Sequence, residues 1–179
     1  MKHIFLIGMI GVFVFAGASE MQDSVVCTET MFGEKTVIGE IEWVDLTHYK
    51  LQLKARIDTG ATTTSVDARN IKVQNQDGRE WALFDIVDRQ TKKRIHLEKP
   101  VVRMAGIKRH GAEEESRPVV KMHVRIGKVE KYIEVTLTDR SKYDYPVLIG
   151  RNMLRDAFVV DVSKKETVAS DSNITGERE

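Results

Sequence analysis

Short segments rich in Val, Ile, Thr and aromatic residues follow one another between residues 37 and 137, and turn-forming residues separate them. The segment KVEKYIEVTL, at 128–137, alternates apolar and polar side chains, which is typical of a half-buried strand. Asp77-Gly78 and Gly127 are hairpin-turn signals. This spacing predicts an all-β barrel or sandwich, with one short helix in GRNMLRDAF at 150–158. The expected strands are Val37–Val44, Leu51–Ile57, Asn70–Val73, Trp81–Val87, Arg94–Leu97, Val119–Ile126 and Lys131–Leu137.

The chain of 179 residues is long enough for one domain, which we place at 37–162. Residues 1–18 combine a basic start, an apolar run and a small-residue end, which predicts a secretory signal peptide. An uncleaved N-terminal anchor is the alternative for that run. Residues 19–36 are expected to be a flexible lead-in, and 163–179 a disordered polar tail.

Export to the periplasm or the medium is therefore expected, with no membrane contact after signal cleavage. The single cysteine, Cys27, cannot form an intrachain disulfide. Basic and acidic residues number 28 and 27, and such a balance gives no broad cationic face for nucleic acid.

Two motifs stand out, although each is common by itself. The first is Asp58-Thr59-Gly60-Ala61, which follows the expected buried strand 51–57. The second is the apolar run Val147-Leu148-Ile149, which ends in Gly150-Arg151-Asn152. Read alone, the first is an ordinary turn and the second is a core strand followed by a helix.

The segment 104–118 has no apolar periodicity and contains Gly106, Ile107 and Gly111. An ordinary solvated loop explains this composition, since most connections are only connections. A mobile lid over a groove explains it as well, because lids need hinges and few buried contacts.

Taken together, the two motifs and their order resemble the retropepsins, the single-domain aspartic proteases. Over 37–162 the segments IGEIEWVDL, ARIDTGATTTSVDA, RPVVKMHVRIG and VTLTDRSKYDYPVLIGRNML look like a bacterial family often labelled putative ATP-dependent zinc proteases and now regarded as retropepsin-like. The resemblance implies a retropepsin-like acid-protease half-barrel with one short C-terminal helix. It also implies that 104–118 is a flap, and Gly106, Ile107 and Gly111 are its candidate residues.

The resemblance assigns the catalytic carboxylate to Asp58, with Thr59, Gly60 and Ala61 supporting its loop. Residues Leu148, Ile149, Gly150, Arg151 and Asn152 are expected to lie beneath and beside it. The zinc and ATP labels find no support, because His48, His96, His110 and His123 are far apart in the sequence and no phosphate-binding loop is present. We therefore expect no metal and no cofactor. The alternative is that these distant residues converge in the folded chain.

Aspartic proteases use two carboxylates that share one proton, and this chain has only one Asp-Thr-Gly. An exported aspartic endopeptidase would therefore act on peptide or protein substrates as a homodimer. The alternatives are a monomeric, inactive peptide-binding or structural module, or a peptidase completed by a different partner protein. Thr62 stands where retroviral enzymes have a carboxylate that pairs with the arginine of the Gly-Arg-Asn turn, so Arg151 is expected to bind Asp67 or Asp161 instead.

Overall fold

The computed structural model describes residues 34–107 and 115–168, and this part of the chain is almost entirely β-structure. No helix in it is long and apolar enough to span a membrane. The prediction of an all-β fold with one short helix is confirmed. The elements are β1 (Thr36–Ile38), β2 (Ile41–Leu46), the 3₁₀-helix η1 (Thr47–Tyr49), β3 (Leu51–Ile57), β4 (Thr64–Gln76), β5 (Arg79–Val87), β6 (Arg94–Pro100), β7 (Arg103–Ile107), β8 (Glu115–Ile126), β9 (Val129–Thr138), β10 (Val147–Ile149), α1 (Arg151–Leu154) and β11 (Phe158–Val160).

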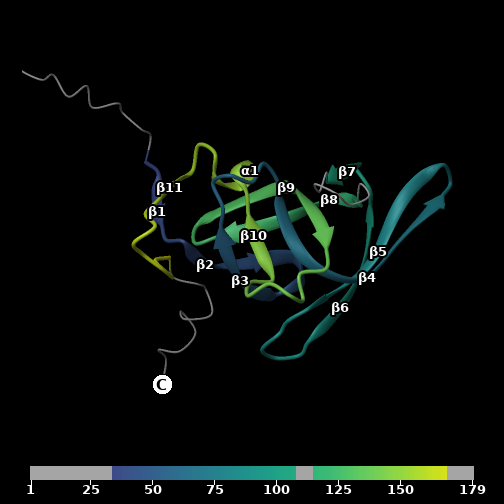
Figure 1. Ribbon diagram of the computed structural model, residues 1–179, viewed down its shortest axis with the longest axis horizontal. Coiled ribbons are helices and arrows are strands. Elements are labelled where there is room, and N and C mark those ends of the chain that lie inside the picture. The colour runs from purple at the N-terminus through teal and green to yellow at the C-terminus, as the bar shows by residue number, and fades with distance from the viewer. Residues whose placement is uncertain (1–33, 108–114, 169–179) are drawn as a thin grey trace, which may run out of the picture. The chain divides into compact units, whose positions relative to one another are not determined.

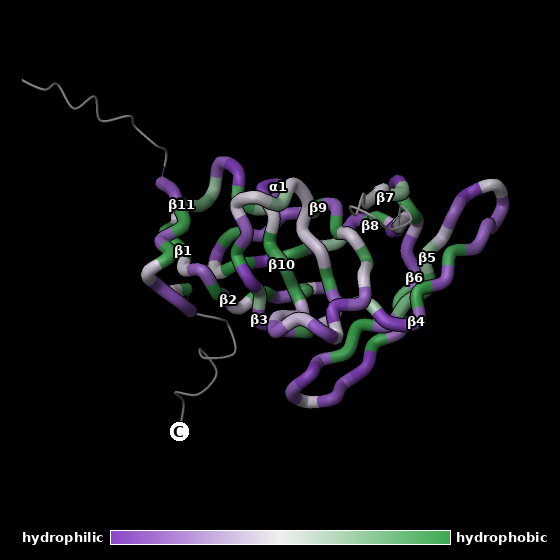
Figure 2. Tube along the Cα trace, in the orientation of Figure 1, coloured by the Kyte–Doolittle hydropathy of each residue, from purple (hydrophilic) through white to green (hydrophobic). Residues whose placement is uncertain are grey.

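Six strands close into a barrel in the order β10-β3-β2-β8-β9-β4, and β4 pairs back onto β10 (Figure 1). Closure removes the free sheet edges that an open sheet of this size would expose. The alternating positions of these strands fill the interior with aliphatic side chains, and Figure 2 shows hydrophobic stretches along them. The barrel is therefore the rigid frame on which the loops between strands are held.

Strand β4 is much longer than the expected Asn70–Val73, because it begins at Thr64 inside the barrel. Its second half leaves the barrel and pairs with β5 as an extended hairpin (Figure 1), and the register of this pairing is irregular between Arg69 and Lys72. The predicted Asp77-Gly78 turn closes this hairpin, and both residues have positive φ, 51° and 80°. Two such residues match the twist of the flanking strands.

The segment 163–168, which the sequence places in a disordered tail, is instead bound to the barrel. The carboxylate of Glu42, fully buried, accepts hydrogen bonds from the backbone and hydroxyl of Thr167 at 3.0 and 2.7 Å. Gly39 lies so close to the segment 163–168 that a Cβ on Gly39 would be 2.3 Å from the Lys164 carbonyl oxygen. The polar composition of 163–168 did not indicate this contact, because the groups that make it are a backbone N–H and a hydroxyl rather than apolar side chains. The expected signal peptide, nearly all of the lead-in, and residues 169–179 lie outside the described residues.

Candidate active site

The loop that follows β3 is fixed by β10, which lies between β3 and β4. Strand β10 runs parallel to β3 and antiparallel to β4, so both ends of the loop 58–63 are attached to the same short strand. The Asp58 N–H donates to the Ile149 carbonyl oxygen at 2.9 Å. The dense apolar run ending at Ile149 therefore sets where the Asp58 side chain leaves the barrel.

The carboxylate of Asp58 is half-buried and held on one side. Its Oδ1 accepts hydrogen bonds from the backbone N–H groups of Gly60 at 2.8 Å and Ala61 at 3.1 Å. Within the described residues, Oδ2 makes no hydrogen bond. Gly60 and Thr59 are exposed beside it. The loop thus presents one oriented carboxylate oxygen that no group of residues 34–107 or 115–168 engages.

Gly150 brings the second motif into direct contact with this loop. A Cβ at this position would lie 2.7 Å from the Thr63 carbonyl carbon, so only glycine fits without displacing the backbone. The Gly150 N–H donates to the Thr64 hydroxyl at 3.2 Å, and that hydroxyl donates to Asn152 Oδ1 at 2.9 Å. Asn152 also donates from Nδ2 to the Glu134 carbonyl oxygen at 2.7 Å, which connects the loop to β9.

Arg151 binds the Asp58 loop of its own chain. Its guanidinium donates to the Gly60 carbonyl oxygen at 2.6 Å and to the Thr62 hydroxyl at 3.0 Å. The expectation that Asp67 or Asp161 would be the partner is wrong, because Thr62 and the loop carbonyls replace the missing carboxylate. Asp161 instead binds Ser163 and Lys164, and these groups lower the pKa of its carboxyl to about 2.

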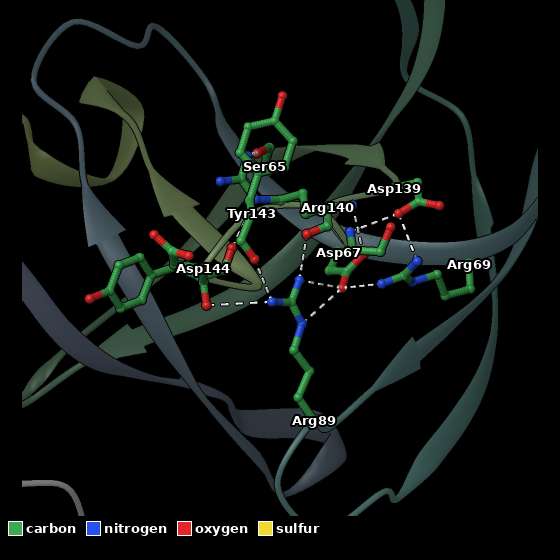
Figure 3. A network of polar contacts seen from close by, with 10 residues as sticks. Ser65, Asp67, Arg69, Arg89, Asp139, Arg140, Tyr143 and Asp144 are labelled. Atoms are coloured by element: carbon green, nitrogen blue, oxygen red, sulfur yellow. Dashed lines mark hydrogen bonds and ion pairs between the residues drawn. The ribbon is translucent and has the colours of Figure 1, made fainter.

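Asp67 lies at the centre of a separate polar network (Figure 3). Its Oδ2 accepts from the guanidinium groups of Arg69 at 2.8 Å and Arg89 at 2.9 Å, and Oδ1 accepts from the Arg140 N–H at 2.8 Å. Only 2% of Asp67 is exposed. Arg89 also donates to the carbonyl oxygens of Arg140 and Tyr143, so the network fixes the segment that leads into β10.

The candidate flap is a β-hairpin for as far as the structure describes it. Strand β7 pairs with β8, with Gly106 opposite Ser116 and Ile107 opposite Glu115. Gly111 lies outside the described residues. At the base of the hairpin, Arg103 donates to Glu134 at 2.9 Å and to the Thr63 hydroxyl at 3.4 Å.

The sequence reasoning missed several residues that build this site. Thr64 carries the contact between the two motifs, and Arg103 and Glu134 connect the loop to the hairpin. Polar and apolar residues alternate from Ser65 to Arg69, next to Thr64, and this alternation is the signal that could have indicated a strand there. A depression of about 490 Å³ adjoins the loop, and its lining includes Thr59, Arg151, Leu154, Phe158 and Val160.

Two histidines that are far apart in the sequence come together elsewhere in the fold. The rings of His48 and His123 are stacked, with centroids 4.0 Å apart. With Glu130 they form the one group of three potential metal ligands found in the described part of the chain.

A closed barrel with β10 between β3 and β4, and an Asp-Thr-Gly loop resting on a glycine turn, defines the aspartic-protease type of half-barrel. A family model described as "RimB-like: Retropepsin-like aspartic endopeptidase RimB" matches residues 37–171, and the chain belongs to this family.

Relatives carry a different name. A probable alpha-L-glutamate ligase of Desulfotalea psychrophila is 33% identical over 132 residues, covering 71% of this chain and 28% of that protein. Another of Shewanella pealeana is 33% identical over 137 residues, covering 75% of this chain and 30% of that protein. This chain thus spans less than a third of their length.

A crystal structure of a Legionella pneumophila protein of unknown function is similar to this fold. Its TM-score is 0.63 at 29% identity, and the match covers 75% of this chain and 98% of that one.

Proposed function

We propose that this chain is an aspartic endopeptidase whose catalytic dyad forms from Asp58 of two copies. The observation that carries the proposal is the state of the Asp58 carboxylate: Gly60 and Ala61 orient one oxygen, and the other makes no hydrogen bond within the described residues. Membership of the retropepsin-like family supports the same chemistry. An oxygen without a partner among the described residues is available to a water or a substrate, which a carboxylate with both oxygens engaged is not.

In the proposed dyad the two carboxyl groups share one proton, since two like charges in contact cannot both ionise. The ionised Asp58 takes a proton from a water whose oxygen bonds to the peptide carbonyl carbon. The protonated Asp58 gives its proton to the carbonyl oxygen. In the second step the C–N bond breaks, the amine nitrogen takes one proton, and the other returns to the dyad. The dyad is regenerated, and one water has been consumed.

The second Asp58 must come from another copy, because the sequence contains no second Asp-Thr-Gly. The exposed Thr59 and Gly60 would then meet their counterparts across a twofold axis. The hairpin β7–β8 would cover the bound peptide as a flap. We propose unfolded or extended peptides as substrates, and export directed by residues 1–18. The proposed hydrolysis uses no metal, no cofactor and no nucleic acid.

Cleavage assays test this proposal. We expect the purified chain to cleave an unfolded protein at acidic pH, with inhibition by a statine-type compound. Asp58→Asn should abolish cleavage, whereas Asp77→Asn, an acid in the β4–β5 turn, should leave it unchanged. A glutamate-rich peptide belongs in the substrate panel because relatives are named glutamate ligases. Absence of cleavage of every substrate from acidic to neutral pH would overturn the proposal.

Mixing tests the shared dyad directly. If wild type and Asp58→Asn chains are unfolded and refolded together in equal amounts, random pairing should reduce total activity to about half of that of the wild type alone. Unchanged activity would mean that each chain works by itself.

The contacts of Arg151 favour one alternative, a monomeric peptide-binding module. Arg151 braces Gly60 and Thr62 of its own chain, so the loop keeps its shape without a partner. Sedimentation distinguishes the two candidates. A monomer that binds extended peptides without cleaving them, with binding unaffected by Asp58→Asn, would support the module.

A further inference from the structure

Three potential metal ligands converge where η1 lies against the β8–β9 hairpin. His48 is in η1, His123 is in β8 and Glu130 is in β9. Their ligand atoms all lie within 4.8 Å of one another. His123 Nδ1 is 3.0 Å from Glu130 Oε1, and the His48 ring stacks on the His123 ring.

The ladder between β8 and β9 explains why two of these residues share a face. His123 is opposite Tyr132 and Arg125 is opposite Glu130, so His123 and Glu130 are diagonal neighbours on one side of the hairpin. Side chains alternate along a strand, and this registry places both on the outer surface. The turn η1, between β2 and β3, then brings His48 over them.

The surroundings hold two of the ligands in place. The Thr47 hydroxyl donates to Glu130 Oε1 at 3.1 Å, which is the kind of outer contact that orients a metal-binding carboxylate. The Tyr132 ring packs against the His123 ring with centroids 4.6 Å apart. His48 is exposed, so its ring is the one that can rotate.

The chemistry of the donors selects the class of ion. Two imidazoles and one carboxylate suit Zn²⁺ and other borderline divalent ions, whereas Mg²⁺ and Ca²⁺ favour sets made of oxygen. Bonds of about 2.0–2.2 Å to a tetrahedral Zn²⁺ put its ligand atoms about 3.3–3.6 Å apart. Rotation of His48 off the stack would bring the three ligand atoms closer together and leave a fourth position for water.

We propose that His48, His123 and Glu130 form a binding site for Zn²⁺ or a similar divalent ion. The site is independent of the proposed peptidase chemistry, because η1 precedes β3 and Asp58 follows it. A strand of this length separates its two ends by about 20 Å. The bound ion would clip the β2–β3 connection to the β8–β9 hairpin. This site differs from the expectation of no metal, which rested on sequence spacing alone.

Zinc binding by the full, untagged chain tests the proposal, with Cys27→Ser in every variant so that no thiol contributes. Titration with Zn²⁺ alone should give one ion per chain and raise the melting temperature. Bound Co²⁺ should show the intense visible absorption of a tetrahedral site. His48→Ala, His123→Ala and Glu130→Gln should each weaken Zn²⁺ binding at least about tenfold.

Two control variants distinguish this site from zinc binding elsewhere on the chain. His96→Ala removes a histidine that pairs with Asp85 on a different strand, and it should not change the affinity. Asp58→Asn should also leave zinc binding unchanged, so a failure of the peptidase proposal would not affect this one. Absence of stoichiometric binding, or binding that His48→Ala and His123→Ala leave intact, would overturn the proposal.

Discussion

Asp58 and Asp67 are two carboxylates of the same region, one before β4 and one within it, and their surroundings are opposite. Asp67 is almost fully buried, and its two oxygens accept from two guanidinium groups and a backbone N–H. Asp58 is half-buried, and only its Oδ1 is engaged within the described residues. A carboxylate that is saturated by the protein stabilises the fold, whereas one held on a single side has an oxygen left for water or substrate.

The largest effect on stability should come from Asp67→Ala. It leaves the Arg69 and Arg89 guanidinium groups without their shared buried partner, and loss of one member of such a cluster costs about 3–5 kcal/mol. Urea unfolding monitored by tryptophan fluorescence measures the change. Asp139→Ala is the matched control: Asp139 also binds Arg69, but its side chain is 63% exposed, and we expect a loss of less than about 1 kcal/mol. Equal losses in both variants would contradict the distinction.

A third carboxylate, Asp85, sharpens the comparison through its pH dependence. The Asn70 amide donates to Asp85 at 2.7 Å and, with His96 and Arg94, holds the pKa of Asp85 below its usual value although burial opposes this. Asn70 has a φ of 53°, so Asn70→Gly removes the amide without backbone strain. We expect a loss of about 1.5–3 kcal/mol at neutral pH.

The direction of the pH effect follows from the lowered pKa of Asp85. Stability from a lowered carboxyl pKa is fully present above the unfolded pKa, 3.8, and is lost as the pH falls through the folded value. The cost of Asn70→Gly in urea unfolding should therefore shrink below about pH 4. Asn75→Ala is the control, because its amide oxygen accepts from the Gly78 N–H and involves no carboxylate. A cost of Asn70→Gly that is the same at neutral pH and below about pH 4 would contradict this account.

Gly150→Ala should affect the Asp58 loop and leave the Asp67 network alone. The added Cβ would lie 2.7 Å from the Thr63 carbonyl carbon, so the loop must move. Overpacking of this kind costs about 1–3 kcal/mol, and we expect proteolysis to fall as well because the carboxylate is displaced. Urea unfolding and the cleavage assay measure the two effects. Full activity at wild-type stability would show that the turn tolerates a side chain.

The parts of the fold that depend on local chemistry were predictable from the sequence. The Asp77-Gly78 turn and strands β3, β5 and β8–β9 follow from turn residues and alternation, and β3 matches its predicted bounds. The pairing of β1 with β11 joins the two ends of the barrel domain, and no turn residue or alternation in the sequence indicates it. The start of β4 was hidden because Thr62 to Ser65 are small and polar, which is typical of a loop.

The candidate site, too, could be predicted only in part, because it depends on contacts between segments that are distant in the sequence. The Asp58 loop and the Gly150 turn could be joined only through a family resemblance, since neither motif is informative alone. The partner of Arg151 was wrongly predicted because backbone carbonyl oxygens, which every residue has, took the place of an acid. The approach of His48 to His123 depends on how η1 folds over β8, which residue spacing does not encode.

Asp58→Asn should have the smallest effect on stability and thereby test the comparison most directly. An asparagine Oδ1 can still accept from the Gly60 and Ala61 N–H groups, and its amide then takes the side that makes no contact within the described residues. We expect the free energy of unfolding to change by less than about 0.5 kcal/mol, while proteolysis falls at least about 100-fold because the dyad loses its base. Asp67→Asn should show the reverse: its effect on the free energy of unfolding should exceed its direct effect on proteolysis, since its new amide faces arginine donors. If Asp58→Asn lowered the free energy of unfolding as much as Asp67→Asn does, the Asp58 carboxylate would be a structural group. Its Oδ2 would then not support a catalytic role.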